Sequence, residues 1–261
     1  MSETKRTVLD LFRLDEQVAM VVGGSRGLGR EMARALAEAG AATVICSRAR
    51  EACEAAAAEI ARATGRDSEA VPMDVTREED VERAFAAAVE RFGRLDVLIN
   101  SAGINARHLI EDCPAETFHD VIETNLTGCW LTCRAAARVM KPRGHGSVVN
   151  VGSALSTVAL PMRTPYCASK FGVVGLTQVL ALEWAESGVR CNALCPGPFL
   201  TEMNKPLLDD PAKTKAVVGQ TALNRWGEMH EITGAAVFLA SPASTYVTGA
   251  SLYVDGGWTA R

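Results

Sequence analysis

The sequence QVAMVVGGSRGLGREMARALAEA, residues 17–39, joins an apolar run to a glycine-rich turn and then to an alanine-rich run. We predict a buried strand over 17–22 and a helix from about Arg30 to Ala39. This arrangement lets backbone N–H groups and a helix N-terminus face a phosphate group. Glycine clusters are common in loops, so the flanking strand and helix carry most of the interpretation.

Apolar and amphipathic runs alternate along the rest of the chain. We predict further strands over 42–46, ending at 73–75, and over 96–99, 147–151, 189–194 and 251–254, with helices over 50–64, 78–92, 114–140, through 166 to about 184, and over 228–240. Such alternation implies an α/β fold with a doubly wound parallel sheet, flanked by helices on both faces. Residues 1–14 form an N-terminal arm, and residues 15–261 form a single domain.

Charge and composition exclude several classes of function. The 27 Lys and Arg are scattered and are outnumbered by 31 Asp and Glu, so we expect no nucleic-acid partner. No apolar run approaches the ~20 residues of a membrane span, and the first 14 residues do not resemble a signal peptide. We therefore expect no membrane partner and a cytoplasmic protein. The eight Cys lack metal-ligand spacing, so we expect reduced, mostly buried thiols and no metal site.

Small or polar residues follow the predicted strands. In a doubly wound sheet, ligands bind at the carboxyl ends of the strands. The residues at these positions are Gly23, Ser47, Asp74, Asn100, Ser153 and Pro196. Their convergence predicts one binding site along this edge of the sheet.

Residues near the second strand bear on the choice of cofactor. In dinucleotide folds an acidic residue there binds the ribose of NAD, whereas a basic residue accommodates the 2′-phosphate of NADP. Here Ser47 and Arg48 occupy this place, and Arg26 lies in the glycine turn. We predict NADP(H) rather than NAD(H), the alternative being that both arginines are ordinary solvated side chains. Asp74 is placed to meet the adenine amino group, or to act as a turn or cap residue.

Tyr166 and Lys170 are four residues apart, so on a helix they share one face. A nearby ammonium group favours the phenolate, and we expect Lys170 to lower the Tyr166 pKa together with the charge of a nicotinamide ring. Ser153 precedes this helix and is placed to hydrogen-bond the substrate oxygen that Tyr166 protonates or deprotonates. The spacing alone also fits a tyrosine at a helix edge beside an exposed lysine.

Asn125 lies inside a predicted helix, where asparagine is mildly unfavourable. Its side chain either bonds a local carbonyl group or holds a water molecule in a proton path. After the fourth predicted strand, Ala102 and Gly103 are small enough for a ribose to approach the backbone closely.

Together these motifs resemble those of the short-chain dehydrogenase/reductase family, over nearly the whole chain after Leu14. The matching positions are Gly23, Gly27 and Gly29 in the glycine turn, Asp74 at the adenine, Asn100, Ala102 and Gly103 after the fourth strand, Asn125, Ser153, Tyr166 and Lys170 in the catalytic tetrad, and Pro196, Gly197 and Thr201 at the nicotinamide. The resemblance implies a Rossmann fold and further cofactor contacts from Ser25, Arg26, Leu28, Ser47, Arg48 and Val75.

The resemblance also implies a role for each member of the tetrad. Tyr166 is the general acid or base, Ser153 orients the substrate oxygen, Lys170 holds the ribose, and Asn125 keeps a relay water. Lys170 and Tyr166 thereby also contact the cofactor. Two residues depart from the family pattern: Val22 stands where threonine is usual, and Ser101 replaces an asparagine. These departures bear on the rigidity of the cofactor loop rather than on the chemistry.

The choice of substrate rests on weaker signals. Residues 11–14, 164–165 and 199–203 are similar to the gluconate 5-dehydrogenase branch of the family, which acts on sugar acids. Arg107 and Arg163 are near enough in sequence to bind a substrate carboxylate, although each also fits an ordinary surface position. The rival activity is reduction of a 3-oxoacyl thioester, with Arg138, Lys141 and Arg143 as a patch for an acidic carrier protein. A non-catalytic NADP-binding scaffold or sensor is the third alternative.

Two expectations concern assembly and access. Family members are usually homotetramers, and the stripe of Gly128, Leu131 and Ala135 fits either subunit packing or an internal core. Residues 199–223 are expected to form a mobile substrate lid.

Overall fold

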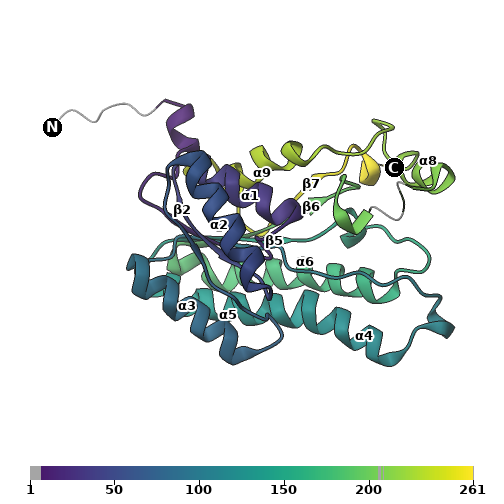
Figure 1. The fold of residues 1–261 in the computed structure, drawn as a ribbon, viewed down its shortest axis with the longest axis horizontal. Coiled ribbons are helices and arrows are strands. Elements are labelled where there is room, and N and C mark those ends of the chain that lie inside the picture. The colour runs from purple at the N-terminus through teal and green to yellow at the C-terminus, as the bar shows by residue number, and fades with distance from the viewer. Residues whose placement is uncertain (1–6, 205–206, 208, 261) are drawn as a thin grey trace.

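A seven-stranded parallel sheet runs through the centre of the computed structural model, which describes residues 7–204, 207 and 209–260 (Figure 1). The strands are β1 Val18–Val22, β2 Ala42–Cys46, β3 Ser68–Ala70, β4 Val97–Asn100, β5 Gly146–Val151, β6 Val189–Pro196 and β7 Ser251–Val254. Their order is β3-β2-β1-β4-β5-β6-β7. The prediction of a doubly wound parallel sheet is confirmed.

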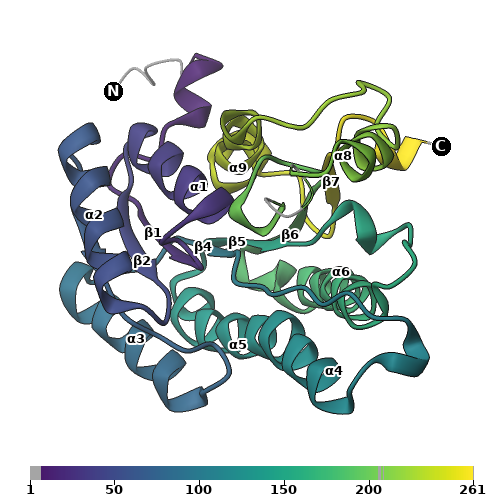
Figure 2. The same ribbon diagram turned by 45° about the vertical axis from the view of Figure 1, so that its right-hand side comes forward.

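Helices cover both faces of the sheet, as Figure 2 shows. The helices are α1 Gly27–Glu38, α2 Arg50–Thr64, α3 Glu78–Phe92, α4 Ala115–Ile122, α5 Gly128–Met140, α6 Thr164–Trp184, α8 Pro211–Val218 and α9 Thr233–Ala240. On one face α1 packs against α2 and α9, and on the other α5 packs against α3 and α6. None of the helices in the described ranges is long and apolar enough to cross a membrane.

β1 shows why the apolar runs are continuous. All five of its residues are buried, because helices cover both faces of the sheet. Met20 points into the core that contains α3, α5 and α6, whereas Ala19 and Val21 point into the core with α1, α2 and α9. An alternating apolar and polar pattern would have left a polar side chain in one of these two cores.

The third strand ends earlier than predicted. β3 stops at Ala70, because Pro72 has no N–H group to donate to the sheet. The next residues still follow β2: the Val71 N–H donates to the Ile45 carbonyl at 3.0 Å, and the Met73 N–H donates to the Ser47 carbonyl at 3.0 Å. Asp74 therefore lies beyond the last of these bonds, in a loop at the carboxyl edge.

The helix predicted over 114–140 is interrupted at Asn125. Residues 123–127 form one π-helical turn between α4 and α5. Such turns are frequent at functional sites. The low helix propensity of Thr124, Asn125, Thr127 and Gly128 is the sequence signal that accompanies it.

The described part of the N-terminal segment lies against the body. Leu14 is fully buried, and its N–H donates to the Ala39 carbonyl at 2.8 Å. The ring of Phe12 lies 6.4 Å from that of Phe238 on α9. Residues 1–6 of the predicted arm lie outside the described residues.

Candidate active site

The glycine turn between β1 and α1 packs too closely for side chains at Gly23, Gly24 and Gly29. A Cβ atom on Gly29 would lie 2.2 Å from the Gly23 carbonyl oxygen, and one on Gly23 would lie 2.6 Å from the Ala102 nitrogen. Gly23 also has a φ of 78°, which favours glycine. Although Val22 supplies no hydroxyl group, the N–H groups of Gly23 and Gly24 both donate to the Cys46 carbonyl, at 2.7 and 3.2 Å. The loop is thus anchored to β2 despite that departure.

This turn fits the pyrophosphate of a dinucleotide. Arg26, the residue that precedes α1, provides no side-chain hydrogen bond to the first turn of the helix. The N-terminus of α1, with the backbone of Ser25, Gly27 and Leu28, therefore presents donors and a positive dipole end to an anion. A bound nicotinamide dinucleotide would place its phosphates here.

Two exposed arginines flank the expected ribose position. Arg26 and Arg48 form no ion pair with any residue in the described ranges, so both guanidinium groups are free to bind a 2′-phosphate. The hydroxyl of Ser47 already lies 3.0 Å from the Cys53 thiol. Ser47 is nevertheless only half-buried and keeps further hydrogen-bonding capacity.

Two other expected cofactor residues have structural partners of their own. Oδ1 of Asp74 accepts hydrogen bonds from the backbone N–H and the hydroxyl of Thr76, at 3.0 and 2.8 Å, as a turn residue does. The Asn100 side chain points into the core, where its amide donates to Asn150 at 2.9 Å and its carbonyl accepts from Thr132 at 2.7 Å. Only the backbone of Asn100 is therefore available to contact a cofactor.

A small cavity at the ends of β1, β4 and β5 joins several expected residues. Val22, Val75, Asn100, Ala102, Thr124, Asn125, Gly128, Cys129, Val151 and Val173 line it. The π-helical turn thus faces the same edge as the glycine turn and residues 100–103.

Ser153 follows β5 in a short turn that fixes its backbone. Its N–H donates to Oγ of Ser156 at 3.0 Å, and its own Oγ accepts from the Leu155 N–H at 3.1 Å. Ser153 is buried, and its hydroxyl is a hydrogen-bond partner of Tyr166 from the following helix. Ser156 was not anticipated from the sequence, although the serine pair at 153 and 156 has the spacing of a capping box.

Lys170 is buried beside Tyr166 and is held by the end of β5. Its Nζ donates to the Val151 carbonyl at 2.7 Å and lies 5.8 Å from the centre of the Tyr166 ring. Burial lowers the pKa of Lys170 to about 8. The predicted neighbourhood of tyrosine, lysine and serine is therefore present.

Lys170 alone does not lower the Tyr166 pKa, and the predicted depression by Lys170 together with a nicotinamide ring stays a prediction. Burial raises the pKa of the phenol, and the hydrogen bond with Ser153 opposes this rise only in part. Lys170 does not reverse the direction, because its ammonium group faces the Val151 carbonyl. Lowering the Tyr166 pKa thus requires a further positive charge, such as that of an oxidised nicotinamide ring.

The Asn125 side chain bonds the backbone of Ile104, 21 residues earlier in the chain, so this carbonyl is not the local one of the first predicted alternative, and the water molecule of the second alternative stays a prediction. Its amide N–H groups donate to the Ile104 carbonyl at 2.9 Å and to Oγ of Ser169 at 3.0 Å, while its Oδ1 accepts from the Ile104 N–H at 2.8 Å. With both side-chain donors engaged, Asn125 fixes the loop after Gly103 against α6. Ser169 and Ile104 were not anticipated from the sequence.

The segment after β6 begins next to β7. The Gly197 N–H donates to the Val254 carbonyl at 2.9 Å, and a Cβ on Gly197 would lie 2.5 Å from the Cα of Asp255. Thr201 is half-buried, and its N–H donates to the Phe199 carbonyl at 2.8 Å.

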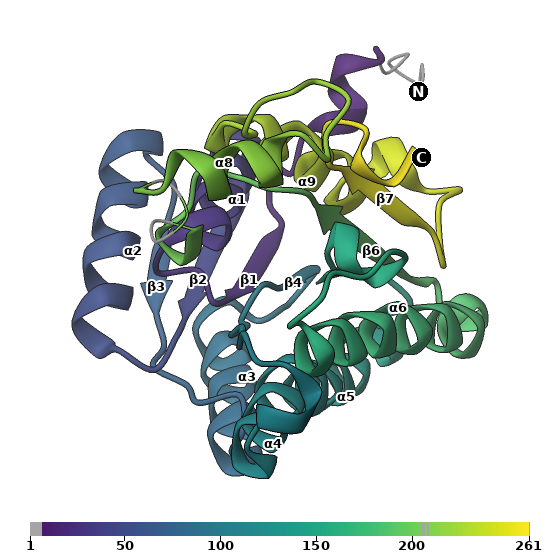
Figure 3. The ribbon, with the colours of Figure 1, turned by 90° about the vertical axis from the view of Figure 1, so that its right-hand side faces the viewer.

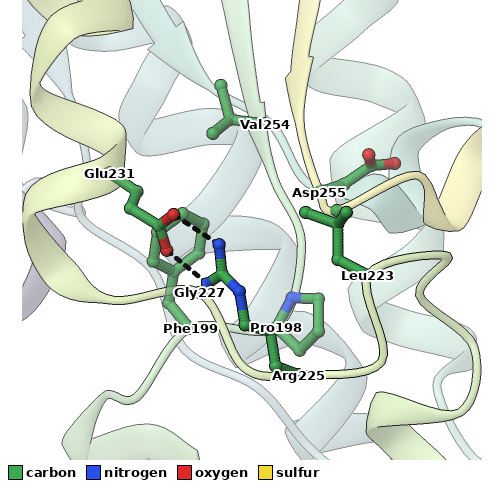
Figure 4. A pocket seen from close by; sticks show the side chains of 9 residues that line it. Pro198, Phe199, Leu223, Arg225, Gly227, Glu231, Val254 and Asp255 are labelled. Carbon is green, nitrogen blue, oxygen red and sulfur yellow. Dashed lines mark hydrogen bonds and ion pairs between the residues drawn. The ribbon is translucent and has the colours of Figure 1, made fainter.

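A pocket beside this segment is drawn in Figure 4 and is lined by Pro198, Phe199, Leu223, Arg225, Gly227, Glu231, Val254, Asp255 and Gly256. Arg225 and Glu231 form a paired ion contact across it at 2.7 Å. Because the guanidinium and the carboxylate neutralise each other, the pair forms one wall of the pocket and leaves no unpaired charge there for a ligand.

Arg107 and Arg163 approach each other at the mouth of the site. The backbones of His108 and Arg163 form an isolated parallel bridge. Burial lowers the pKa of Arg163, and the positive charge of Arg107 lowers it further. Neither arginine forms an ion pair with a residue in the described ranges. Two like charges held together without an acidic partner are a favourable place for an anion.

Comparisons with known proteins agree with this geometry. A family model described as enoyl-(acyl carrier protein) reductase matches residues 22–259, which include the glycine turn, Tyr166 and Lys170. A gluconate 5-dehydrogenase of Gluconobacter oxydans (strain 621H) is 39% identical over 250 residues, covering 96% of this chain and 97% of the relative. The chain belongs to the short-chain dehydrogenase/reductase family. The resemblance noted in the sequence is thereby confirmed.

Further proteins that resemble this dehydrogenase/reductase are also named as dehydrogenases. A D-threitol dehydrogenase of Mycolicibacterium smegmatis is 37% identical, with full coverage of both chains. The crystal structure of a gluconate 5-dehydrogenase from Burkholderia cenocepacia J2315, in complex with NADP and tartrate, is 40% identical, covers 98% of this chain and 100% of its own, and has a TM-score of 0.94. This short-chain dehydrogenase/reductase is thus an NAD(P)-dependent enzyme that acts on CH–OH groups of small molecules.

Proposed function

We propose that the enzyme interconverts a ketone and a secondary alcohol of a sugar acid or polyol, with NADP(H) as cofactor. The observation that carries the proposal is the arrangement around Tyr166: a buried lysine on the same helix face, a serine fixed at the end of β5, and a dinucleotide-binding turn on the same edge of the sheet. When bound, the nicotinamide supplies or accepts the hydride.

Tyr166 is the proton donor in reduction and the proton acceptor in oxidation. In reduction its hydroxyl gives a proton to the oxygen of the substrate carbonyl group, while Ser153 holds that oxygen by a hydrogen bond. In oxidation the phenolate takes the proton of the substrate hydroxyl. Because burial raises the Tyr166 pKa, the phenol keeps its proton at neutral pH and can donate it.

Lys170 and Asn125 support this proton transfer. The Nζ of Lys170 lies between the Val151 carbonyl and the Tyr166 ring, a position from which it can hold ribose hydroxyls and, when charged, favour the phenolate. Since both side-chain donors of Asn125 are engaged, a relay water would take its hydrogen bonds from other groups around the π-helical turn. Asn125 thus acts by fixing the loop after Gly103 against α6.

The preference for NADP over NAD rests on Arg26 and Arg48. Both are exposed beside the glycine turn and β2, and no carboxylate stands at the end of β2 to bind ribose hydroxyls. Guanidinium groups form charge-assisted hydrogen bonds to phosphate. The NADP in the B. cenocepacia structure supports the same assignment.

The sugar-acid substrate is supported by Arg107 and Arg163 and by the names of the relatives. The two guanidinium groups lie near Tyr166 on the loop after β4 and just before the first residue of α6. A carboxylate bound there would place a neighbouring carbinol carbon near the tyrosine. A second relative, the 5-keto-D-gluconate 5-reductase of Escherichia coli K12, is 37% identical over 248 residues.

The rival activity on a carrier-bound thioester has less support. Arg138 pairs with Glu82, so its charge is already matched. Lys141 and Arg143 follow α5 and lie before the amino end of β5, whereas Ser153 lies beyond its carboxyl end. A six-residue strand spans about 20 Å, so this patch lies at the opposite edge of the sheet from the chemistry.

We also propose how copies of the chain associate and which segment covers the substrate. The stripe of Gly128, Leu131 and Ala135 is buried within the chain, so it is not the tetramer surface. Trp130, Phe171, Val179 and Leu182 are instead exposed on α5 and α6, and they suit a helix-to-helix contact between copies. Residues 199–223 are proposed to close over substrate; within them 205, 206 and 208 lie outside the described residues.

Initial rates of NADPH and NADH oxidation test the proposal, with 5-ketogluconate and an acetoacetyl thioester compared side by side. We expect NADPH turnover of the keto acid that disappears in Tyr166→Phe. A marked preference for NADH would contradict the roles of Arg26 and Arg48. Turnover of the thioester alone would favour the acyl substrate, and NADPH binding without any turnover over a wider panel of ketones would favour a scaffold or sensor.

A further inference from the structure

The backbone that carries Ser153 is enclosed by side chains from neighbouring elements. A Cβ atom on Gly152 would lie 2.7 Å from the Cys195 sulfur and 3.0 Å from Oγ of Ser156. The same Ser156 oxygen accepts the Ser153 N–H at 3.0 Å. A thiol from β6 and a hydroxyl from the turn therefore close on the peptide immediately before the serine, and glycine at position 152 leaves room for both.

Cys195 is connected in turn to the edge strand. β6 and β7 pair in a register that sets Cys195 opposite Tyr253, so the two side chains share one face of the sheet. The phenol of Tyr253 is a hydrogen-bond partner of the Cys195 thiol and of Thr157. Cys195 is fully buried, and burial raises its pKa, so it is a neutral thiol at physiological pH.

We propose that Cys195, held between Tyr253 on β7 and Ser156 in the turn, is a positioning residue that sets the Ser153 hydroxyl against Tyr166. The proposal rests on the role that the proposed function gives to Ser153. Cys195 gives no group to the reaction and acts through the backbone of residues 152 and 153. The edge strand thereby contributes to catalysis without contributing a group to the site.

A pH profile separates this role from simple packing. The titratable or charged groups around Tyr166 are Cys167 and Lys170 on its own helix, Arg163 just before that helix, and Cys195 from β6. Ser153 is the hydrogen-bond partner that lowers the Tyr166 pKa. If the serine moves away, this pKa rises, and the midpoint of the oxidation rate against pH moves to higher pH.

The test uses three variants of the full-length enzyme and the substrate that the rate comparison above selects. Tyr253→Phe removes one hydroxyl, Cys195→Val removes the thiol at similar size, and Cys195→Ser keeps a hydrogen-bonding group. We expect the first two to lower kcat by about three- to tenfold with little change in KM, and to raise the midpoint by about half a pH unit. Cys195→Ser should restore both values toward those of the wild type.

Cys191→Val is the matched control, because Cys191 lies on the same face of β6, four residues before Cys195. It should leave the midpoint unchanged. A lower Tm with an unchanged midpoint in Tyr253→Phe and Cys195→Val would show packing alone and overturn the proposal. So would wild-type kinetics in both variants while Ser153→Ala is inactive, a result that leaves the proposed function intact. Full activity of Ser153→Ala would instead refute the proposed function itself.

Discussion

Two stretches meet at the carboxyl edge of the sheet and are held in different ways. Between Val151 and Lys170 the candidate catalytic groups are fixed by hydrogen bonds to buried neighbours, such as the one from Lys170 to the Val151 carbonyl. Residues 199–223 are tied to the rest of the chain near both ends, where the Leu200 N–H donates to the Gly227 carbonyl at 3.1 Å and the Leu223 N–H donates to the Gly256 carbonyl at 3.1 Å. α8 lies between these two ends in sequence. In space, α8 and α4 lie on opposite sides of the sheet at the same end of the molecule (Figure 1, Figure 3).

This contrast indicates that the first stretch serves proton transfer and the second serves substrate selection. Proton transfer needs atoms placed within a few tenths of an ångström, and strands and helices provide that precision. Substrate choice needs a surface that tolerates sequence change, which a segment anchored near its ends provides. Substitutions in the first stretch should therefore change kcat, and those around the second should change KM.

The largest effect is expected from removing the phenol hydroxyl. Tyr166→Phe should lower kcat by about 10³-fold, since general acid–base catalysis contributes roughly 10²–10⁴-fold. The NADPH dissociation constant should stay within a few-fold of that of the wild type. Stopped-flow turnover and fluorescence titration of NADPH measure the two quantities, and retained turnover would remove Tyr166 from the mechanism.

The second effect concerns the buried lysine. Its pKa is about 8 in the folded protein and about 10.4 in an unfolded chain, so between these values the unfolded state binds more protons and stability rises with pH. Relative to Lys170→Met, the cofactor-free wild type should gain at most about 3 kcal/mol from pH 8 to pH 10.

Urea unfolding of both proteins at several pH values measures this difference in the free energy of unfolding. The contributions of distant buried thiols such as Cys46 are common to both proteins and cancel. The usable pH range ends near pH 10. Above this ordinary tyrosine pKa of about 10 the free energy of unfolding falls with pH, because the pKa of Tyr166 is raised in the folded protein. A difference that stays constant with pH would mean that Lys170 keeps its charge when folded.

A smaller effect should follow from removing one arginine at the mouth. Arg163→Ala should raise KM for a sugar acid by about tenfold, the loss of one charge-assisted contact, and should leave KM for a neutral polyol unchanged. Arg143→Ala, an exposed arginine at the opposite edge, is the control. Equal effects on the acid and the polyol would show that Arg163 has a structural role only.

The smallest effect is expected inside the second stretch. The Asn204 amide donates to the Phe199 carbonyl at 2.9 Å, and Asn204→Ala removes this bond near the surface. We expect KM to rise about two- to threefold with Tm nearly unchanged, in keeping with a net hydrogen-bond contribution of roughly 1 kcal/mol or less. A fall in kcat comparable to that of Tyr166→Phe would erase the distinction between the two stretches.

Regular sequence patterns predicted the regular parts of the molecule. The helices Arg50–Thr64 and Glu78–Phe92 begin and end as expected, because an amphipathic pattern and a following glycine with positive φ define them locally. β3 was placed too late, since an apolar run through Pro72 does not reveal where pairing stops. Local signals do not report which neighbour a strand will find.

The site was predicted by residue type but not by contact. The spacing of Tyr166 and Lys170 required a common helix face, whereas the partner of Lys170 is a carbonyl 19 residues earlier, which no spacing indicates. No spacing indicated, either, that the Asn100 amide would lie in a buried polar network. Predicting the Tyr166 pKa also required the burial of the ring, a property of the folded chain.

The strand order also determines how the sheet can form during translation. β2 and β3 add to one side of β1 in turn, and β4, β5, β6 and β7 add to the other side, so no strand has to enter between two that are already paired. A nascent chain can thus extend its sheet in the order of translation, but it exposes an apolar, unpaired edge until Ser251–Val254 is released from the ribosome. Products truncated after β5 should therefore accumulate as aggregates rather than as folded fragments.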